Sequence, residues 1–461
     1  MMEVYTVPLT GPQNTGKFLI YRPVAGLAFV GNRAMTARAK RAAGDAWSAD
    51  QEPPALAGAV AFLREIGYLE PDPPPPITPP RVVKSLALLL TNQCTLRCTY
   101  CYAAAGELPA QELSVENGRS AIDYVFDQAA AAGLPEVVIS FHGGGEPTFA
   151  WKLLQNLTRY ARARPLKSVI SLTTNGVWSA RQREWIFANV DRIGISMDGA
   201  PATQDHQRPL RSGGPSSPLV LRNLAEMDRR GIKYGVRVTA TAPWTHLPGD
   251  VEFICRETGT QNIQVEPAFN TERGGHQEPP ESEWRAFADA LLQARDIARS
   301  YHKDLHYSGA RAGQAAQVFC TAPYDAMVVA PGGRLVACYE ITSEDHPLAA
   351  IGLFGTIQDG QVQVDQAARE NLHRLMAERR ATCQDCFCYW SCAGDCFVQA
   401  FGSGEQGHLT KTARCALNRY ITEQILLDMI AQGDGYWSIR QESSLAPLPP
   451  ISPWEEELYG D

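Results

Sequence analysis

Cysteines carry most of the chemistry that this sequence could perform, and the chain contains twelve of them. Three, Cys94, Cys98 and Cys101, stand close together in one run, and Cys255 stands alone. The others gather in the C-terminal part: Cys320, Cys338, Cys383, Cys386, Cys388, Cys392, Cys396 and Cys415. The N-terminus lacks the basic start and long apolar run of an export signal, so we expect a cytoplasmic protein with reduced thiols. Clustered reduced thiols indicate metal ligands rather than disulfides.

The spacing of the first three cysteines is typical of an iron–sulfur cluster. Three thiolates in one loop can each bind a different iron of a [4Fe–4S] cube and leave the fourth iron open to a small molecule. A zinc site is the alternative, but structural zinc normally has four protein ligands, and no fourth Cys or His lies near Cys101. The run therefore favours a reactive cluster.

Alternating strands and helices are expected to position this loop. Short apolar runs lie at 83–90, 137–141, 169–172, 193–197, 236–240 and 263–265, with helical stretches between them. Six such repeats predict an α/β fold, a partial (β/α)6 barrel of the TIM type with parallel strands. Chemistry in such barrels sits at the carboxyl ends of the strands. Cys94 and the segments 143–147, 173–176 and 196–199 all follow predicted strands, so we expect them to meet at one mouth.

The three-cysteine run directly after the first strand resembles the signature of the radical S-adenosylmethionine (SAM) superfamily, over residues 83–300. In that family SAM chelates the open iron through its amino and carboxylate groups. One electron from the cluster splits SAM into methionine and a 5′-deoxyadenosyl radical, which abstracts hydrogen from the substrate. The resemblance therefore implies an oxidoreductase that uses SAM and a [4Fe–4S] cluster.

Further segments resemble the parts of this family that hold SAM. Gly143 to Pro147 resembles the GGEP segment, in which glycine lets the backbone approach the SAM amino group closely. Thr174-Asn175 and Ser196-Met197-Asp198 resemble later SAM-lining segments, and Tyr100 is expected against the adenine. Arg208 and Arg237 are candidates for the SAM carboxylate, with a surface ion pair as the alternative for each. The implied SAM set is Tyr100, Gly143, Gly144, Gly145, Glu146, Pro147, Thr174, Asn175, Ser196, Asp198, Arg208 and Arg237.

The later cysteines resemble the SPASM domain, an extension of some radical SAM enzymes that binds two auxiliary [4Fe–4S] clusters, which makes three clusters in all. The resemblance assigns Cys320, Cys338 and Cys396 to the nearer cluster, and Cys383, Cys386, Cys392 and Cys415 to the farther one. Residues 321–337 contain no cysteine, so we expect an open iron in the nearer cluster. A two-zinc ribbon is the alternative.

Two cysteines lie outside this pattern, and we expect Cys255 and Cys388 to be buried, unreactive thiols. In an extended segment alternate residues point the same way, so Cys386 and Cys388 would face one site. Cys388 is therefore expected not to be a ligand.

The chain divides into five predicted parts. Residues 1–70 form a small α+β unit, residues 71–82 a stiff Pro-rich linker, and residues 83–307 the barrel. Residues 308–432 form the cysteine-rich domain, and residues 433–461 a Pro-rich, acidic tail without assigned structure. The first unit resembles a reduced winged domain that captures leader peptides of ribosomally made natural products (RiPPs). Its exposed strand edge could take up a leader as an added strand, although a structural cap on the barrel is the alternative.

SPASM enzymes mostly modify peptides or proteins, so the resemblance implies a maturase that forms a thioether or carbon–carbon crosslink in a precursor peptide. A sulfatase-maturing oxidase that converts Cys or Ser to formylglycine is the alternative, and methyl transfer stays open. An electron-transfer protein would not explain three ligands beside a Gly-rich loop. The net charge of −8 gives no sign of a nucleic-acid surface, and no apolar run is long enough to span a membrane. An external electron donor such as a flavodoxin or ferredoxin is the other expected partner.

Overall fold

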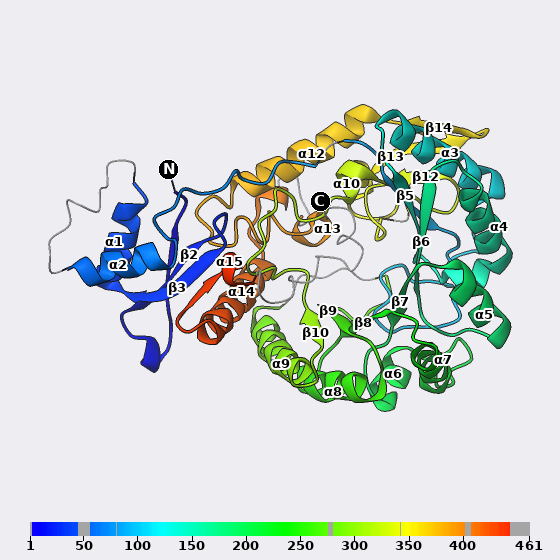
Figure 1. Ribbon diagram of the computed structural model, residues 1–461. Helices are drawn as coiled ribbons and strands as arrows, with labels where there is room; N and C mark the ends of the chain where they lie inside the picture. The colour runs from blue at the N-terminus through cyan, green and yellow to red at the C-terminus, as the bar shows by residue number, and fades with distance from the viewer. Residues whose placement is uncertain are drawn as a thin grey trace.

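A curved parallel β-sheet forms the centre of the protein (Figure 1). The structure is a computed structural model that describes residues 2–44, 56–79, 81–274, 280–341, 343–401 and 407–442. Within these ranges, seven strands follow one another in chain order, and each pairs in parallel with the next. They are β4 (Ser85–Leu89), β5 (Glu136–His142), β6 (Lys167–Thr174), β7 (Arg192–Ser196), β8 (Gly235–Ala240), β9 (Asn262–Pro267) and β10 (Asp304–His306). This order confirms the partial α/β barrel, and β10 adds a strand to the six that were expected.

Helices cover the outer face of these strands (Figure 1). They are α3 (Val115–Ala131), α4 (Trp151–Arg162), α5 (Ala180–Asn189), α6 (Pro201–Gln207), α7 (Ser217–Arg229), α8 (Leu247–Glu257) and α9 (Glu281–Ser300), with 3-10 turns η4 (Pro147–Ala150) and η5 (Trp244–His246). The first begins after Ser114, whose side chain accepts a hydrogen bond from the Asn117 amide at 3.0 Å. No helix among the described residues is both long and apolar enough to cross a membrane.

Alternation along the strands decides which side chains face the inside of the barrel. In β5, Val137, Ile139 and Phe141 are buried in the core beneath the helices. His142 therefore projects from the opposite face, into the lumen. In β8 the same alternation buries Val236 and Val238 and turns Arg237 inward.

The cysteine-rich part continues the same sheet on the other side of β4. The strand β11 (Ala326–Val329) pairs in parallel with β4, and β12 (Arg334–Val336), β13 (Leu353–Gln358) and β14 (Gln361–Val364) follow as antiparallel neighbours. Its helices are α10 (Ala322–Asp325), α11 (Ala349–Gly352), α12 (Gln366–Ala381), α13 (Phe397–Ala400) and α14 (Ala413–Gln432), with the 3-10 turn η6 (Gly407–Leu409). Residues 382–394 are mostly turns.

The N-terminal unit is a small antiparallel sheet with two helices. Its elements are β1 (Tyr5–Pro8), the 3-10 turn η1 (Pro12–Asn14), β2 (Lys17–Arg22), β3 (Leu27–Asn32), α1 (Arg33–Ala42) and α2 (Ala57–Glu65). One sheet face packs on these helices, and the other packs on Phe387, Cys388 and α14. The linker residues 71–79 form no helix or strand.

The predicted tail begins with ordered structure. Residues Tyr436–Ser438 form β15, which pairs antiparallel with β3, and α15 (Ile439–Glu442) follows. Trp437 is 3% exposed and packs against Leu426 and Ile430 of α14, which explains why this Pro-rich region holds a strand. The rest of the predicted tail, 443–461, lies outside the described residues.

Candidate active site at the carboxyl ends of the strands

The loop after β4 carries the first three thiols and is fixed by backbone hydrogen bonds. The Arg97 amide donates to the Pro209 carbonyl, and the Thr99 amide donates to the Gln207 carbonyl, each at 2.9 Å. Leu96 is 1% exposed and anchors the loop in the interior. The loop therefore belongs to the frame of the barrel.

The three thiols of this loop lie near one another. Burial raises the pKa of Cys94 to about 12, and the charges of Glu146, Cys98 and Cys101 add to the rise. The sulfur of Cys94 accepts hydrogen bonds from the Leu96 amide (3.4 Å) and from Asn175 Nδ2 (3.7 Å). Such donors support the sulfur ligands of iron–sulfur clusters. Among the described residues, no three Cys, His, Asp or Glu side chains converge as for a single metal ion. The donor set fits a [4Fe–4S] cluster.

The Gly-rich segment after β5 packs directly on this loop. Gly144 has a φ of 118°, in the region that favours glycine. A Cβ on Gly145 would lie 2.1 Å from the Gln93 carbonyl oxygen, so a side chain cannot be accommodated there. Glu146 is 3% exposed, and its carboxylate accepts hydrogen bonds from Thr174 Oγ1 (2.7 Å) and the Asn175 amide (2.8 Å). Pro147 begins η4. Glu146 thus joins the ends of β5 and β6.

A buried network links Tyr100, Asp198 and Arg208. The Tyr100 hydroxyl donates to Asp198 Oδ2 at 2.5 Å and accepts from Arg208 Nη1 at 2.6 Å. Burial raises the pKa of Asp198, while Arg208, 3.7 Å away, opposes that rise. Arg208 is 7% exposed, so its ion pair lies inside the protein and not on the surface. Burial raises the pKa of Cys98, and the Arg208 charge lowers it, which places this cation beside the thiol loop.

A close approach between Gly199 and Asp250 supports the segment after β7. Gly199 has a φ of 151°, and a Cβ there would lie 2.2 Å from Asp250 Oδ1. Asp250 accepts hydrogen bonds from the Ala200 amide and Thr203 Oγ1, both at 2.9 Å. A cavity of about 240 Å³ borders Asp198 and Asp250 on this side.

Arg237 lies apart from this network. It pairs in register with Ser196 of β7, and its Nη1 lies 3.4 Å from His142 Nε2. The His142 ring stacks on Tyr339, with ring centroids 4.2 Å apart. The two arginine candidates therefore occupy different parts of the barrel interior.

The C-terminal thiols form two electrostatic groups. Burial raises the pKa of Cys338, and the charges of Glu340, Cys396 and Cys320 add to it. Burial likewise raises the pKa of Cys383, with added contributions from Cys386 and Cys415, and Cys415 also adds to the raised pKa of the buried Cys392. These electrostatic groups overlap the sets that the SPASM resemblance assigns, Cys320, Cys338 and Cys396, and Cys383, Cys386, Cys392 and Cys415, while Cys388 also lies beside the second group. The ligand assignment stays a prediction.

The two remaining cysteines are buried, Cys388 at 2% and Cys255 at 4% exposure. The extended conformation expected between Cys386 and Cys388 is wrong. Successive turns form there, because the Cys386 amide donates to the Cys383 carbonyl and the Cys392 amide donates to the Cys388 carbonyl. The two thiols still meet, and the hydrogen bond from Cys388 is the main cause that lowers the pKa of Cys386 to about 6.

Residues that the sequence did not single out also support the site. Arg273, beyond the end of β9, donates to the Cys98 carbonyl at 2.5 Å and to the Ala105 carbonyl at 2.9 Å. Its place just after a barrel strand was the available signal. His142 ends β5 directly before the Gly-rich segment, but its inward direction depends on the register of the whole strand.

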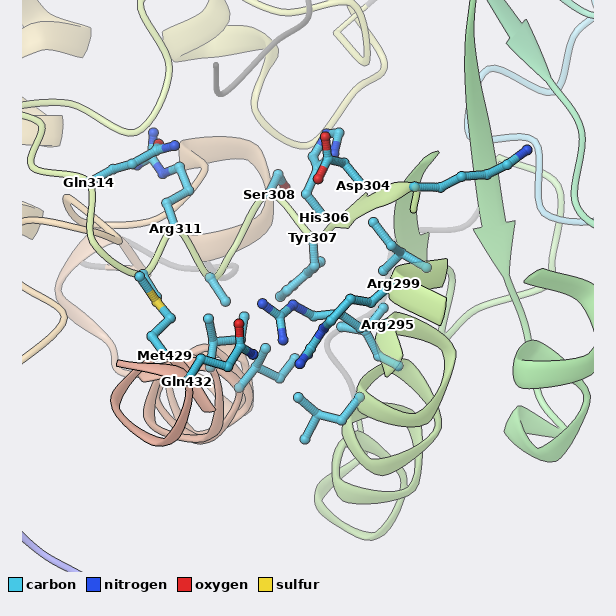
Figure 2. A pocket seen from close by; sticks show the side chains of 18 residues that line it. Arg295, Arg299, Asp304, His306, Tyr307, Ser308, Arg311, Gln314, Met429 and Gln432 are labelled. Carbon is cyan, nitrogen blue, oxygen red and sulfur yellow. The ribbon is translucent and has the colours of Figure 1, made fainter. Parts of the chain in front are cut away.

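A larger cavity of about 320 Å³ lies between α9 and α14 and reaches His306 at the end of β10 (Figure 2). Arg295 and Arg299 of α9 pair there with Asp428 of α14, at 2.6 and 2.7 Å. Tyr307 reaches the same space and donates to Asn418 Oδ1 at 2.9 Å. None of the residues expected to bind SAM or metal lines this cavity.

Known proteins match the barrel in sequence. Residues 88–243 match the family model described as Radical SAM superfamily. Fe-coproporphyrin III synthase of Methanosarcina barkeri is 35% identical over 32% of this chain and 35% of its own length. Pre-heme d1 synthase of Dinoroseobacter shibae is 28% identical over 43% of this chain and 48% of its own. The chain thus spans between about a third and a half of these two curated relatives.

Solved structures match over more of the chain. The anSMEcpe structure with bound AdoMet covers 77% of this chain and 96% of its own, with a TM-score of 0.59 and 18% identity. Streptococcus suis SuiB bound to S-adenosylmethionine covers 83% of this chain and 87% of its own, with a TM-score of 0.50 and 14% identity. These two likenesses show the shared fold. The family match includes the three-cysteine loop and shows that residues 88–243 form a radical SAM domain, a family that implies SAM and a [4Fe–4S] cluster.

Proposed function

We propose that the protein is a peptide maturase that forms an intramolecular thioether or carbon–carbon crosslink in a ribosomally made precursor. The observation that carries this proposal is the position of the thiol group Cys320, Cys338 and Cys396. Tyr339 follows Cys338 directly and stacks on His142, so this group lies beside the lumen that the first thiol loop also borders. A substrate in the lumen would lie between two redox centres.

The chain's own residues prepare the SAM site. Cys94, Cys98 and Cys101 are the proposed ligands of the first cluster, and Gly143 to Pro147 the segment that meets the SAM amino group. When bound, the cluster supplies the electron that splits SAM and gives the 5′-deoxyadenosyl radical. Tyr100, Asp198 and Arg208 hold one another rigidly beside the thiol loop, so the site needs little reorganisation when SAM binds.

Formation of the crosslink removes two hydrogens from the peptide. One leaves as a hydrogen atom on 5′-deoxyadenosine, and the other leaves as a proton and an electron. The two C-terminal thiol groups are the proposed ligands of auxiliary [4Fe–4S] clusters, and a flavodoxin or ferredoxin is the proposed external electron carrier. The buried Cys388 is left outside both ligand sets.

Solved structures of the same fold support a peptide as the substrate. One structure of anSMEcpe holds AdoMet and the Kp18Cys peptide, and one structure of SuiB is bound to the precursor peptide SuiA. These peptides belong to those proteins, and for this chain a peptide substrate is our proposal.

The strand order of the N-terminal sheet limits the edges at which a leader could add as a strand. Among the described residues its order is β1-β2-β3-β15, so β15 already occupies the edge of β3. The Leu9 amide donates toward β2, to the Lys17 carbonyl, at 3.0 Å. Because direction alternates along an antiparallel strand, the Thr6 amide points away from β2. We therefore propose β1 as the docking edge.

A single proline tests this docking edge. Thr6→Pro removes the outward donor and leaves the bonds to β2 in place. We expect weaker binding of the precursor with an unchanged melting temperature, and Thr15→Pro in the adjoining turn serves as the control. Equal precursor affinity in wild type and Thr6→Pro would favour the structural-cap role.

The function itself is tested by the product. Protein reconstituted without oxygen should carry about twelve iron and twelve sulfide, and should form 5′-deoxyadenosine when reduced. With its precursor peptide, mass spectrometry should show a loss of two hydrogens, and fragmentation should separate a crosslink from formylglycine. A peptide that gains a methyl group would refute the proposal.

A further inference from the structure

Arg237 in the lumen of the barrel is a cation without an acidic partner among the residues that the structure describes. Among the described residues, no carboxylate lies within 4.0 Å of the Arg237 guanidinium. Its nearest polar neighbour is His142 Nε2, at 3.4 Å. By contrast, Arg208 is committed to Tyr100 and Asp198. A partly buried arginine normally has an anionic or carbonyl partner, so the position invites a ligand.

Because of the tautomer of His142, both groups in this contact are hydrogen-bond donors. The Gly143 amide donates to His142 Nδ1 at 2.8 Å, so this nitrogen is the acceptor. In a neutral imidazole the other nitrogen, Nε2, then carries the proton. Arg237 has only donors, and therefore neither group can satisfy the other. An oxygen placed between them would accept from both.

The surroundings of His142 keep its imidazole neutral. Burial lowers the pKa of His142 to about 3, and the Arg237 charge adds to that effect. Burial lowers the pKa of His306 in the same way, to about 4. Both ring nitrogens of His306 are buried without a hydrogen-bond partner in the described structure. One positive charge therefore faces a lumen lined by neutral imidazoles.

We propose that Arg237 and His142 form a two-donor cradle for a carboxylate of the peptide substrate, an assignment that rests on the proposed function. Such a carboxylate belongs to an Asp or Glu side chain or to the peptide C-terminus. It accepts from the Arg237 guanidinium and from His142 Nε2–H, and it neutralises the lumen charge. The cradle is a specificity-determining site that orients the peptide between the two thiol groups.

The position of the cradle favours the peptide over SAM as the source of the carboxylate. The charge of Arg208 reaches Cys98, whereas that of Arg237 reaches both Tyr339, which adjoins Cys338, and Tyr102, which adjoins Cys101. The stack of His142 on Tyr339 holds the cradle on that same side. The acid group is therefore bound in the lumen between the nearer auxiliary thiols and the three-cysteine loop, where a peptide substrate would lie.

An mRNA-displayed library of random peptides is the probe, selected without oxygen on the reconstituted enzyme in the presence of SAM. Wild type should enrich peptides with Asp or Glu at a fixed position, or peptides with a free C-terminus over amidated ones. Arg237→Gln should abolish the enrichment and weaken a selected acidic peptide about tenfold to a hundredfold. Peptides in which that acid is replaced by its amide should bind both proteins within about threefold, since they lack the charge.

Two further variants distinguish loss of the cradle from a general loss of structure. His142→Phe keeps an aromatic ring on Tyr339 but removes the Nε2 donor, and should weaken the acidic peptide by about threefold to tenfold. Arg229→Gln, on a surface side chain that is 67% exposed, should bind as wild type does.

Peptide enrichment without any acidic preference would overturn the cradle and leave the maturase proposal standing. Enrichment of no peptides would overturn both. A loss of SAM affinity in Arg237→Gln as large as the loss of peptide affinity would assign the cradle to SAM instead.

Discussion

The barrel mouth and the cysteine-rich domain both gather thiols, but different forces hold them. The three-cysteine loop follows β4, whose Leu86 and Leu88 are fully buried in the aliphatic core of the parallel sheet. The cysteine-rich domain contains instead a set of buried arginines: Arg311, Arg369, Arg379, Arg380 and Arg414.

Four of these arginines, all but Arg414, donate to backbone carbonyls. Arg311 donates to the carbonyls of Ser391 (2.8 Å) and Phe319 (3.0 Å). Arg379 donates to the Gly394 carbonyl at 3.3 Å and approaches the Cys415 sulfur at 3.3 Å. A buried carbonyl without a partner is costly, and one guanidinium offers five donors. The comparison teaches that a turn-rich domain can replace sheet hydrogen bonds with buried cations. We propose that its fold also depends more than the barrel does on the clusters proposed for it.

The largest expected effect is on activity at the barrel mouth. The triple change of Cys94, Cys98 and Cys101 to Ala should abolish SAM cleavage and remove one cluster, about four of twelve irons. Its melting temperature should fall by only about 2 to 4 °C, because strands and backbone bonds hold the loop. Iron analysis, 5′-deoxyadenosine formation and thermal melting measure this. A collapse of the fold in this variant would contradict the comparison.

For the farther thiol group, by contrast, we expect the main effect of the substitutions to be on stability. Changing Cys383, Cys386 and Cys392 to Ala should also remove about four irons, but should destabilise the cysteine-rich domain by at least several kcal/mol, since metal binding supports its turns. Limited proteolysis should then cut first within residues 382–396. Equal melting temperatures for the two triple variants would show that both regions depend alike on metal.

Removal of a buried cation should have an intermediate effect. Arg414 and Asp395 form an ion pair with side chains 7% and 1% exposed. Arg414→Met leaves the Asp395 charge buried and alone, so we expect a loss of about 3 to 5 kcal/mol in unfolding free energy. The control is Arg374→Met, on an exposed pair with Glu378, which should cost less than about 1 kcal/mol. If chemical denaturation shows similar losses of unfolding free energy for both variants, buried arginines have no special role in the stability of this domain.

The smallest effect is expected at Cys388. Cys388→Ala should keep all iron and most activity, at a cost of about 1 kcal/mol for the lost buried sulfur. Cys396→Ala should lose the nearer cluster instead. Iron content and Mössbauer spectra of the two variants distinguish these outcomes. Iron loss in Cys388→Ala would make it a ligand.

Local sequence signals predicted much of the barrel and its mouth. Apolar runs marked β4 to β9, and the Cys94 spacing and the Gly143 segment stood directly at strand ends. The sequence did not predict elements that span very few residues or that depend on pairing with distant parts of the chain. The three residues of β10 are too few to show a period, and β15 pairs with a strand about 400 residues away in the chain. The turns between Cys383 and Cys396 depend on Arg311 and Arg379, whose targets are backbone carbonyls that no side-chain pattern reveals.

The pairing of β15 with β3 also sets an order of assembly during synthesis. Ribosomes make residues 27–32 early and residues 436–438 more than four hundred residues later. At typical elongation rates the third strand waits about 20 to 80 seconds before its neighbour exists. During that interval β3 has an open edge, which is a known route to unwanted strand pairing. A nascent chain stalled before residue 436 is therefore the form of this protein that most needs a chaperone.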